Sequence, residues 1–265
     1  MDEICKEIRR MTLECIGSIG SGHIGGSMSI VELLRVLYFD KMSVDPKNPK
    51  MEGRDRLIVS KGHAGPAVYA TLALKGFFPK DWLYTLNRFG TNLPSHCDMN
   101  KTPGVDMTAG SLGQGFSCAI GVAIGSKLKK DGATIYAIVG DGESQEGQIW
   151  EAAMLGAQKK LDNLIAFTDK NNMQLDGYTD DINSLGDLKA KWRAFGWYTQ
   201  EIDGHDCEAI SAAIDRAKAK KGKPSMIILD TIKGKGVSFA ENAGPSCHSM
   251  SLPKEKVEAA LAELQ

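Results

Sequence analysis

The sequence lacks a strong charge of either sign. Its 265 residues carry 32 lysines and arginines against 33 aspartates and glutamates, for a formal net charge of −1. Proteins that bind a nucleic-acid backbone or an anionic membrane surface through electrostatics usually have a clear excess of basic residues. We therefore expect neither nucleic acid nor a membrane as a partner.

Long apolar runs and closely spaced cysteines are also missing. No apolar run is long enough to span a bilayer, and the charged, amphipathic N-terminus has no signal-like apolar core. The six cysteines show no close-paired zinc or redox spacing; they are Cys5, Cys15, Cys97, Cys118, Cys207 and Cys247. We expect reduced thiols in a cytoplasmic protein.

What the sequence does contain is an alternation of strand and helix patterns. Apolar runs with a β-branched bias predict buried strands at 56–60, 133–139, 164–168, 198–202 and 224–230. Helical patterns fill segments between and around them, among them 2–16, 28–39, 81–89 and 253–264. Because strands alternate with helices throughout, we predict a single α/β domain over residues 1–265. Its sheet should be doubly wound and largely parallel, with helices on both faces.

Two polar loops follow neighbouring strand patterns. Asp141, flanked by Gly140 and Gly142, comes after the run 133–139, and Asn171 comes after the run 164–168. The helical segment between them makes one crossover unit, so the two strands should be parallel and end at the same sheet edge. The glycines let a bulky anion approach, and carboxylate, amide and carbonyl oxygens suit Mg²⁺ with phosphate. A lone Gly-Asp-Gly would be an ordinary polar loop, but this strand–turn–helix setting favours a metal–diphosphate site.

Four of the five histidines lie on loops that favour a site. His23 stands in a glycine-rich segment, His63 follows a strand pattern, and His96 and His248 lie on irregular loops. A structural role is the simpler interpretation for any one of them, but four in such loops favour a functional cluster. The fifth, His205, is expected to be an ordinary loop residue.

Glycines also gather at residues 110–115, before the helical pattern 116–129. Glycines at the start of a helix would leave amide donors free for a phosphate. We therefore expect this loop to face an anionic group.

Five segments, taken in order, resemble transketolase. They are Ser21-Gly22-His23, residues 60–64, residues 110–115, residues 140–147 with Asn171-Asn172, and residues 233–236 followed by His248. The resemblance covers nearly the whole chain, but only the N-terminal, diphosphate-binding half of the family. The chain looks like the N-terminal subunit of a split transketolase. This implies transfer of a two-carbon ketol unit from a ketose or its phosphate to an aldose or its phosphate, with thiamine diphosphate as cofactor.

The resemblance also implies roles for individual residues. The predicted ligands of Mg²⁺, or of another divalent cation such as Ca²⁺ or Mn²⁺, are Asp141, Asn171 and the carbonyl of Met173. The predicted cofactor contacts are His63, Gly113, Gln114, Gly115, Gly140, Asp141, Gly142, Asn171, Leu175 and His248, with Leu175 against the thiazolium. The predicted catalytic residues are His23, His63, His96, His248 and Glu146. Among these, His23 and His96 would contact the sugar, and Glu146 would couple paired active sites.

The sequence departs from the family pattern at two positions. Ile24 and Cys97 stand where the family usually has proline after the first and third histidines. The second change leaves the orientation of His96 open. Neither position is a predicted metal ligand.

The resemblance implies a partner chain. In this family a glutamate of the pyrimidine-binding domain activates the cofactor, and we expect that domain and the C-terminal domain on a second chain. Two copies of each chain in a heterotetramer are the expected assembly, with Glu146 facing its symmetry mate. The sugars are left open between ordinary phosphates of the pentose phosphate pathway and a modified or sulfonated analogue.

Three alternatives are weighed against this hypothesis. A 2-oxoacid dehydrogenase α subunit would share Gly-Asp-Gly, but its expected segments do not include Ser-Lys-Gly-His-Ala. Deoxyxylulose-phosphate synthase has a related fold, yet the loops at His63 and Asp141 fit it less well. The third is a non-catalytic, cofactor-binding regulatory chain, and an assay with and without a partner distinguishes it.

Overall fold

Five parallel strands form the central sheet of the computed structural model, which describes residues 2–264. The strands are β2 (Arg56–Val59), β3 (Ile135–Gly140), β4 (Leu164–Lys170), β5 (Tyr198–Asp203) and β6 (Ser225–Asp230). Their order across the sheet is β2-β3-β4-β6-β5, and all four neighbouring pairs are parallel. The predicted parallel sheet is confirmed; Met1 and Gln265, the ends of the predicted domain, lie outside the described residues.

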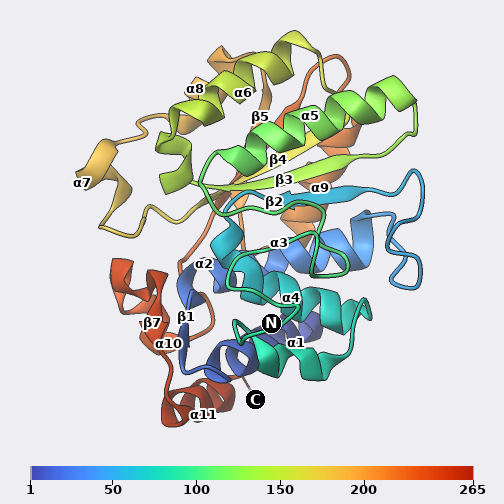
Figure 1. Ribbon diagram of the computed structural model, residues 1–265. Helices are drawn as coiled ribbons and strands as arrows, with labels where there is room; N and C mark the ends of the chain where they lie inside the picture. Colours follow the sequence, from blue (N-terminus) through green and yellow to red (C-terminus); the bar gives the residue numbers. More distant parts are fainter. Residues whose placement is uncertain (1, 265) are drawn as a thin grey trace.

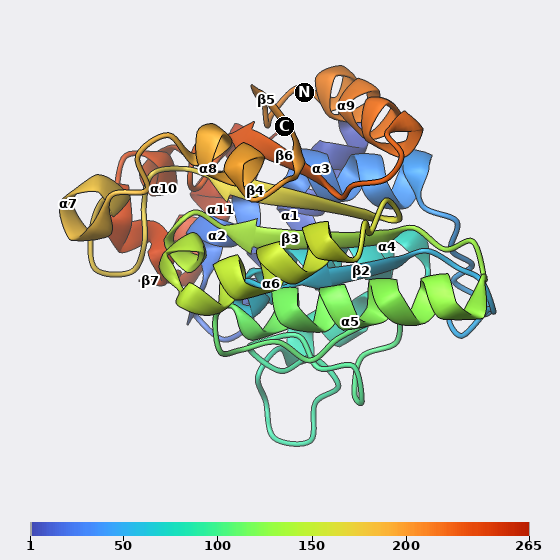
Figure 2. The same ribbon diagram turned by 90° about the horizontal axis from the view of Figure 1, so that it is seen from above.

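Helices cover both faces of this sheet (Figures 1 and 2). One face carries α5 (Gln114–Lys129), α6 (Gly147–Gln158) and α8 (Leu188–Ala194), and the other carries α1 (Glu3–Gly17), α3 (Val31–Val36), α4 (Gly65–Lys75) and α9 (Cys207–Ala219). Strand side chains alternate between the two layers, so that Ile58 packs in the core under α5 and Val59 in the core under α4. The predicted α/β class is confirmed. Within residues 2–264, no helix combines the length and apolar character needed to cross a bilayer.

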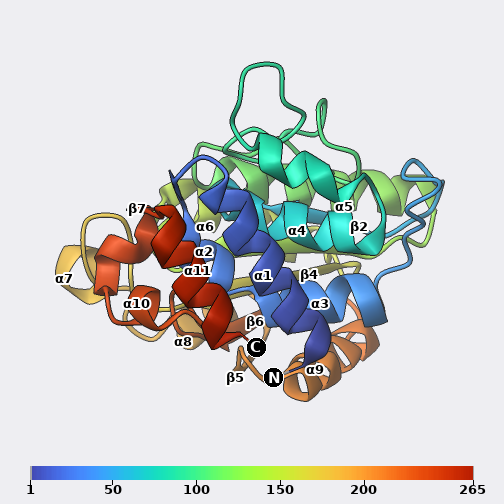
Figure 3. The same ribbon diagram turned by 90° about the horizontal axis from the view of Figure 1, so that it is seen from below.

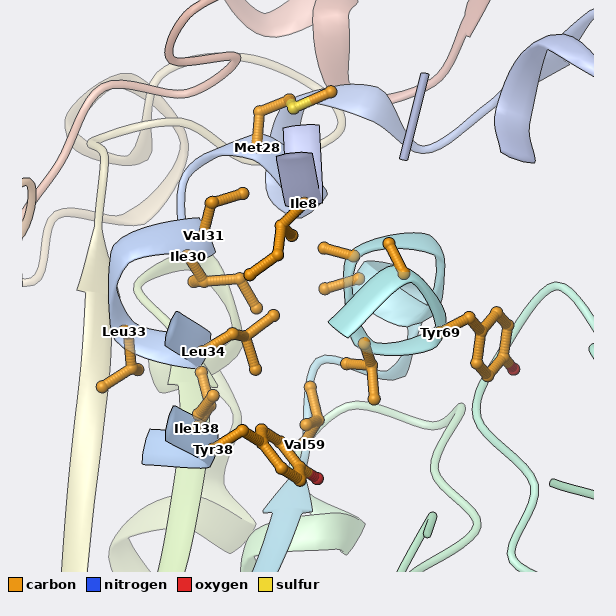
Figure 4. Close-up of a cluster of buried hydrophobic side chains, with 14 of the residues drawn as sticks. Ile8, Met28, Ile30, Val31, Leu33, Leu34, Tyr38, Val59, Tyr69 and Ile138 are labelled. Atoms are coloured by element: carbon orange, nitrogen blue, oxygen red, sulfur yellow. The ribbon is translucent and has the colours of Figure 1, made fainter. Parts of the chain in front are cut away.

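The larger core lies between the sheet and the helices α1, α3 and α4. Figure 4 shows Ile8 of α1 and Leu34 of α3 meeting Val59 and Ile138 of the strands. All four side chains are almost completely buried. Burying each such side chain stabilises the fold by roughly 1.5–3 kcal/mol. This packing fixes the N-terminal helices against the sheet edge where the polar loops emerge.

A second, two-stranded sheet joins the two ends of the chain. β1 (Ser21–Gly22) pairs antiparallel with β7 (Met250–Ser251), with Ser21 opposite Ser251. The short helices α2 (Ile24–Met28) and α10 (Ser238–Glu241) flank this sheet, and α11 (Lys254–Glu263) packs beside α1 (Figure 3). The pairing brings His23 and His248 close together. The sequence did not predict it, because two-residue strands have no periodic pattern.

Two predicted helices are wrong in extent. The pattern at 28–39 forms the end of α2, then α3, then a π-helical turn (Leu37–Lys41), because the chain breaks at Ile30 with φ −110° and ψ 12°. The break leaves the Ser29 hydroxyl donating to Asp169 of the sheet at 2.6 Å. The pattern at 81–89 forms only a 3₁₀ helix (Lys80–Thr85), and Asn87 has a φ of 53° that no continuing helix accepts.

Gly62 and Gly121 provide a test of this packing. A Cβ at Gly62 would lie 2.2 Å from the carbonyl oxygen of Ala109, whereas a Cβ at Gly121, inside α5, meets nothing within 4 Å. Gly62→Ala should lower the free energy of unfolding by about 2 kcal/mol or more, since main chain must move. Gly121→Ala should raise it by about 0.5–1 kcal/mol. Urea unfolding of both variants measures the difference, and equal stabilities would contradict the close approach at Gly62.

Candidate functional site

The candidate site lies at the carboxyl ends of the central strands. Gly140 of β3 is in register with Asp169 of β4, so the following residues Asp141 and Asn171 emerge next to each other. A cavity of about 440 Å³ opens there and is lined by both of them. It is also lined by all four predicted histidines, which are His23, His63, His96 and His248. The expectation that these loops meet at one edge of the sheet is confirmed.

Three oxygen ligands of the kind that a divalent cation accepts face this cavity. Asp141 is 2% exposed; its carboxylate accepts the N–H of Gly142 at 2.7 Å and the N–H of Asn172. Asn171 Oδ1 accepts the N–H of Met173 at 3.2 Å, while its Nδ2 donates to Asp169 at 3.0 Å. Both side chains are therefore fixed in orientation, and each oxygen retains a lone pair. With the Met173 carbonyl, they give a carboxylate, an amide oxygen and a backbone oxygen, a set that suits Mg²⁺ with phosphate.

The site already holds a cation against one of these oxygens. The ammonium of Lys233 lies 3.1 Å from the Met173 carbonyl oxygen and 3.4 Å from Nδ1 of His248. Burial lowers the pKa of Lys233 and the charge of Lys61 adds to this, while Asp141 and Asp169 act in the opposite direction. Lys233 belongs to the last of the segments that resemble transketolase, but its sequence context alone gave it no role. Its signal was a lysine within the glycine-rich stretch 233–236.

Asp141 is poised for a positive partner. Burial first, and the charge of Asp169 second, raise the pKa of Asp141 to about 6. Ionising this buried carboxyl costs free energy, and a divalent cation beside it would remove that cost. The neighbouring Gln174 Oε1 is buried and accepts no hydrogen bond from any residue between 2 and 264, and a Cβ at Gly142 would lie 2.7 Å from Gln174 Cβ. No group of three or more His, Cys, Asp or Glu suited to a metal occurs in that same range, so the mixed oxygen set at Asp141 is the candidate.

A buried ion pair supports the site from below. Asp169 accepts hydrogen bonds from the ammonium of Lys61 at 2.6 Å, from Ser29 at 2.6 Å, and from Thr231 and Asn171. Burial alone would raise the pKa of Asp169, but the charge and hydrogen bond of Lys61 and the two hydroxyls hold it below its ordinary value. Asp169 is therefore a carboxylate, and it joins four separate segments of the chain.

The loop 110–115 differs from its prediction. The N–H of Gly113 donates to Glu143 Oε1 at 2.8 Å, so the expectation of an amide free for a phosphate is wrong at Gly113. Gly110 and Leu112 line the cavity, whereas residues 113–115 do not. A Cβ at Gly115 would lie 2.7 Å from Ser60 Cα, so this glycine lets α5 approach the end of β2. The cofactor contacts of Gly113, Gln114 and Gly115 stay a prediction.

The four histidines form one cluster. The ring of His23 lies 5.5 Å from His63, 5.4 Å from His96 and 5.4 Å from His248, and His63 lies 4.8 Å from His248. Burial is the first cause that lowers the pKa of each; nearby charges add to it for three of them, and His248 falls to about 3. At neutral pH these imidazoles are uncharged and can accept or relay protons. The ring of His96 lies against that of His23, so the cysteine at position 97 does not turn His96 away from the cavity.

Two predicted residues lie at the mouth of the cavity. Leu175 is 63% exposed and Glu146 is also exposed, and both line the opening. Leu112, 37% exposed, lies on the same rim. An exposed leucine beside a polar cavity is available to a cofactor ring or to another protein surface.

Comparison with known proteins agrees with this geometry. Residues 1–264 match the family described as transketolase, thiamine diphosphate binding domain. A 6-deoxy-6-sulfo-D-fructose transketolase subunit of Clostridium sp. (strain MSTE9) is 60% identical over 258 residues, which are 97% of this chain and 94% of that protein. An apulose-4-phosphate transketolase subunit of Actinobacillus succinogenes is 41% identical over 266 residues, covering 100% of this chain and 96% of that one.

The solved structures agree with the sequence comparison. Transketolase from Leishmania mexicana superposes with a TM-score of 0.93 at 29% identity, over 99% of this chain and 41% of that chain. The chain therefore spans about two fifths of the solved transketolase that it matches. The 2-oxoacid dehydrogenase and deoxyxylulose-phosphate synthase alternatives give way to the family that matches.

Asp141→Asn tests the metal assignment. The amide keeps the size of the side chain but removes its charge, so Mg²⁺-dependent binding of thiamine diphosphate should weaken by more than about 100-fold. Asp176→Asn is the matched control, because Asp176 lines the same cavity but is exposed. Calorimetric titration with cofactor and Mg²⁺ measures both. Wild-type affinity in Asp141→Asn would remove Asp141 from the ligand set.

The histidine cluster predicts how stability depends on pH. Each pKa lies below its ordinary value of 6.5, so under that pH the unfolded chain binds protons that the folded chain refuses. Stability should be full above pH 6.5 and fall by roughly 1–3 kcal/mol by pH 5.5. Asp141, with its raised pKa, acts in the opposite direction between about pH 4 and 6, and Glu143, whose pKa burial also raises, adds to it, but these are two groups against four.

Urea unfolding at pH 7.5, 6.5 and 5.5 measures this dependence. His248→Gln should reduce the slope, because it removes one of the groups whose pKa is lowered. A stability that stays constant from pH 7.5 to 5.5 would show that the imidazoles protonate without cost.

Proposed function

The chain belongs to the transketolase family as its thiamine diphosphate-binding domain, and we propose that it is the N-terminal subunit of a two-chain transketolase. Such an enzyme transfers a two-carbon ketol unit from a ketose to an aldose. The observation that carries the proposal is one cavity in which the oxygens of Asp141, Asn171 and Met173 stand beside four uncharged histidines. A metal–diphosphate anchor and a set of proton carriers are the two parts that this reaction requires of the domain.

The cofactor would be held by groups that already point into the cavity. Asp141, Asn171 and the Met173 carbonyl would bind Mg²⁺ or a similar divalent cation, and Gly140 and Gly142 would allow the diphosphate to approach. The ammonium of Lys233 and the ring of His63 lie on the same side and would face the diphosphate oxygens. When bound, thiamine diphosphate supplies a carbon nucleophile and an electron sink for the transferred unit.

The histidines would hold and move protons around the sugar. Lys233 can only donate, so Nδ1 of His248 accepts its hydrogen bond, and the imidazole proton of His248 then resides on Nε2. We assign His248 as a donor at a sugar or cofactor oxygen through this N–H. His23, whose ring contacts the other three, and His96 would contact the sugar hydroxyls. Their closed, half-buried setting would limit access of water.

The donor we propose is a ketose with an anionic group at its terminal carbon. The relative that is 60% identical carries the name of a 6-deoxy-6-sulfo-D-fructose transketolase subunit, and this sulfonated ketose is the first donor to test. Of the two buried lysines of the cavity, Lys61 is paired with Asp169, and Lys233 would face the diphosphate. The anionic end of the sugar would therefore meet cationic groups of the partner. Of the two sugar classes that the sequence left open, we therefore propose the modified sugar rather than an ordinary phosphate of the pentose phosphate pathway.

The partner we propose is a chain that carries the pyrimidine-binding and C-terminal domains. It would close over the rim formed by Leu112, Leu175 and Glu146, with two copies of each chain and Glu146 facing its symmetry mate. Relatives of similar length are named as transketolase subunits, which supports a divided enzyme. All six cysteines are free thiols, which suits the cytoplasm that we propose as its location.

Reconstitution tests this function. The purified chain alone should not transfer a ketol unit, because a diphosphate anchor without the pyrimidine site cannot orient the reacting carbon. Mixed with its partner, it should be active with 6-deoxy-6-sulfo-D-fructose and an aldose phosphate acceptor, and less active with fructose 6-phosphate as donor. Full activity of the single chain would refute the divided enzyme. Cofactor binding without activity on any donor would favour a regulatory role.

A further inference from the structure

The loop 231–237, which carries Lys233, contains two glycines and needs contacts with the rest of the fold to keep one conformation. Gly234 and Gly236 have φ values of 84° and 85°, a region that residues with side chains rarely adopt. Lys233 nevertheless lies with its ammonium on the Met173 carbonyl at one end of the cavity. Besides the bond of Thr231 to Asp169, two contacts from residues that do not line the cavity hold this loop, one at Ile232 and one at Lys235.

His205 holds the first of these points. Its Nε2 accepts the backbone N–H of Ile232 at 2.8 Å, and its Nδ1 lies 3.1 Å from Glu32 Oε2. Since an amide nitrogen only donates, Nε2 must carry the lone pair and Nδ1 must carry the proton. Nδ1–H therefore donates to the Glu32 carboxylate. The side chain is 13% exposed, and both ring nitrogens are occupied.

Glu32 in turn binds Arg9, which makes the second contact with the loop, at Lys235. The guanidinium of Arg9 contacts both carboxylate oxygens of Glu32, at 2.8 and 3.0 Å, and its Nε donates to the carbonyl of Lys235 at 2.9 Å. A Cβ at Gly236 would lie 2.7 Å from Arg9 Nε, so that glycine makes room for the arginine. The path from Ile232 through His205, Glu32 and Arg9 to Lys235 connects the two ends of the segment that contains Lys233 and Gly234.

The turn that presents His205 is itself fixed against the loop. A Cβ at Gly204 would lie 2.4 Å from Thr231 Cγ2, so only glycine allows this approach. Asp203 accepts the N–H of His205 at 2.7 Å, and Asp206 accepts the N–H groups of Glu208 and Ala209 at the start of α9. The expectation that His205 is an ordinary loop residue misses these contacts, because a single histidine in a polar turn carries no sign of a distant partner.

We propose that His205 is a positioning residue, which fixes the loop 231–237 through Ile232 and, through Glu32 and Arg9, through Lys235, so that Lys233 stays directed at the diphosphate end of the cavity. The inference rests on the proposed function, in which Lys233 faces the cofactor. His205 itself touches neither the cavity nor any group that would react. Its contribution is to keep the ammonium in place before the cofactor arrives.

Two substitutions separate the two ring nitrogens. His205→Gln places an amide oxygen near the position of Nε2 and can still accept the N–H of Ile232. His205→Asn reaches only the position of Nδ1, so it can still donate to Glu32 but leaves Ile232 without an acceptor. In the full chain, hydrogen exchange of the amides near Ile232 should rise in His205→Asn and stay near wild type in His205→Gln, which should loosen only the amides near Lys235. The affinity for thiamine diphosphate with Mg²⁺ should fall by about tenfold in His205→Asn and by less than about threefold in His205→Gln.

Lys233→Ala completes the test as a double-mutant cycle. If His205 acts through Lys233, His205→Asn should not weaken cofactor binding further once Lys233 is alanine. Additive losses, or equal losses in His205→Gln and His205→Asn at matched unfolding free energies, would overturn the proposal. If the wild-type chain with its partner binds no thiamine diphosphate, the proposed function fails. The exchange of the 231–237 amides then still decides whether His205 fixes the loop.

Discussion

The buried ion pair between Lys61 and Asp169 is the contact on which the site depends. Lys61 follows β2, Asp169 is the penultimate residue of β4, and the two side chains are 2% and 0% exposed. Removing one partner of such a pair leaves an uncompensated buried charge, at a typical cost of about 3–5 kcal/mol. Asp169 also receives Ser29 and Thr231, so the helical layer and the β6 loop are fixed to the same carboxylate. Burial, and after it the charge of Asp169, raises the pKa of Asp141, so a cation beside this carboxylate would be favourable.

Close contacts at glycine then hold the segments of His23, Lys233 and His248 next to this ion pair. A Cβ at Gly25 would lie 2.7 Å from the carbonyl oxygen of Cys247, and Gly234 donates its N–H to Gly25 at 3.1 Å. A side chain at Gly25 would also meet Cys247 Sγ and Lys233 Cγ, so the segments of His23, Lys233 and His248 meet at a position that only glycine can occupy. Groups held in this way lose little freedom when a ligand binds, which is the physical benefit of a preorganised site.

The sequence could predict what depends on local patterns. Strand periodicity and the crossover between 133–139 and 164–168 were enough to place Asp141 beside Asn171 at one sheet edge. Contacts between segments far apart in the chain left no such pattern: the β1–β7 pairing, Gly113 with Glu143, and Cys5 with Cys207, whose sulfurs lie 3.9 Å apart. Helix extent failed at 28–39 for the same reason, because Ser29 follows its bond to Asp169 rather than its own helical propensity.

In the proposed function, the two lysines of the cavity, Lys61 and Lys233, link cofactor binding to proton transfer. Burial is the first cause of the lowered pKa of His63 and His248, and the charges of Lys61 and Lys233 add to it. In the proposed function, the ammonium that would attract a diphosphate thus also keeps the neighbouring imidazoles uncharged. Asp169 balances Lys61, and Asp141 partly balances Lys233, but Glu143, Glu146 and Asp176 also line the cavity, so its acidic groups outnumber its lysines. In the proposed function, a divalent cation would add positive charge to this acidic lining, so the histidines would not need to protonate when a diphosphate binds.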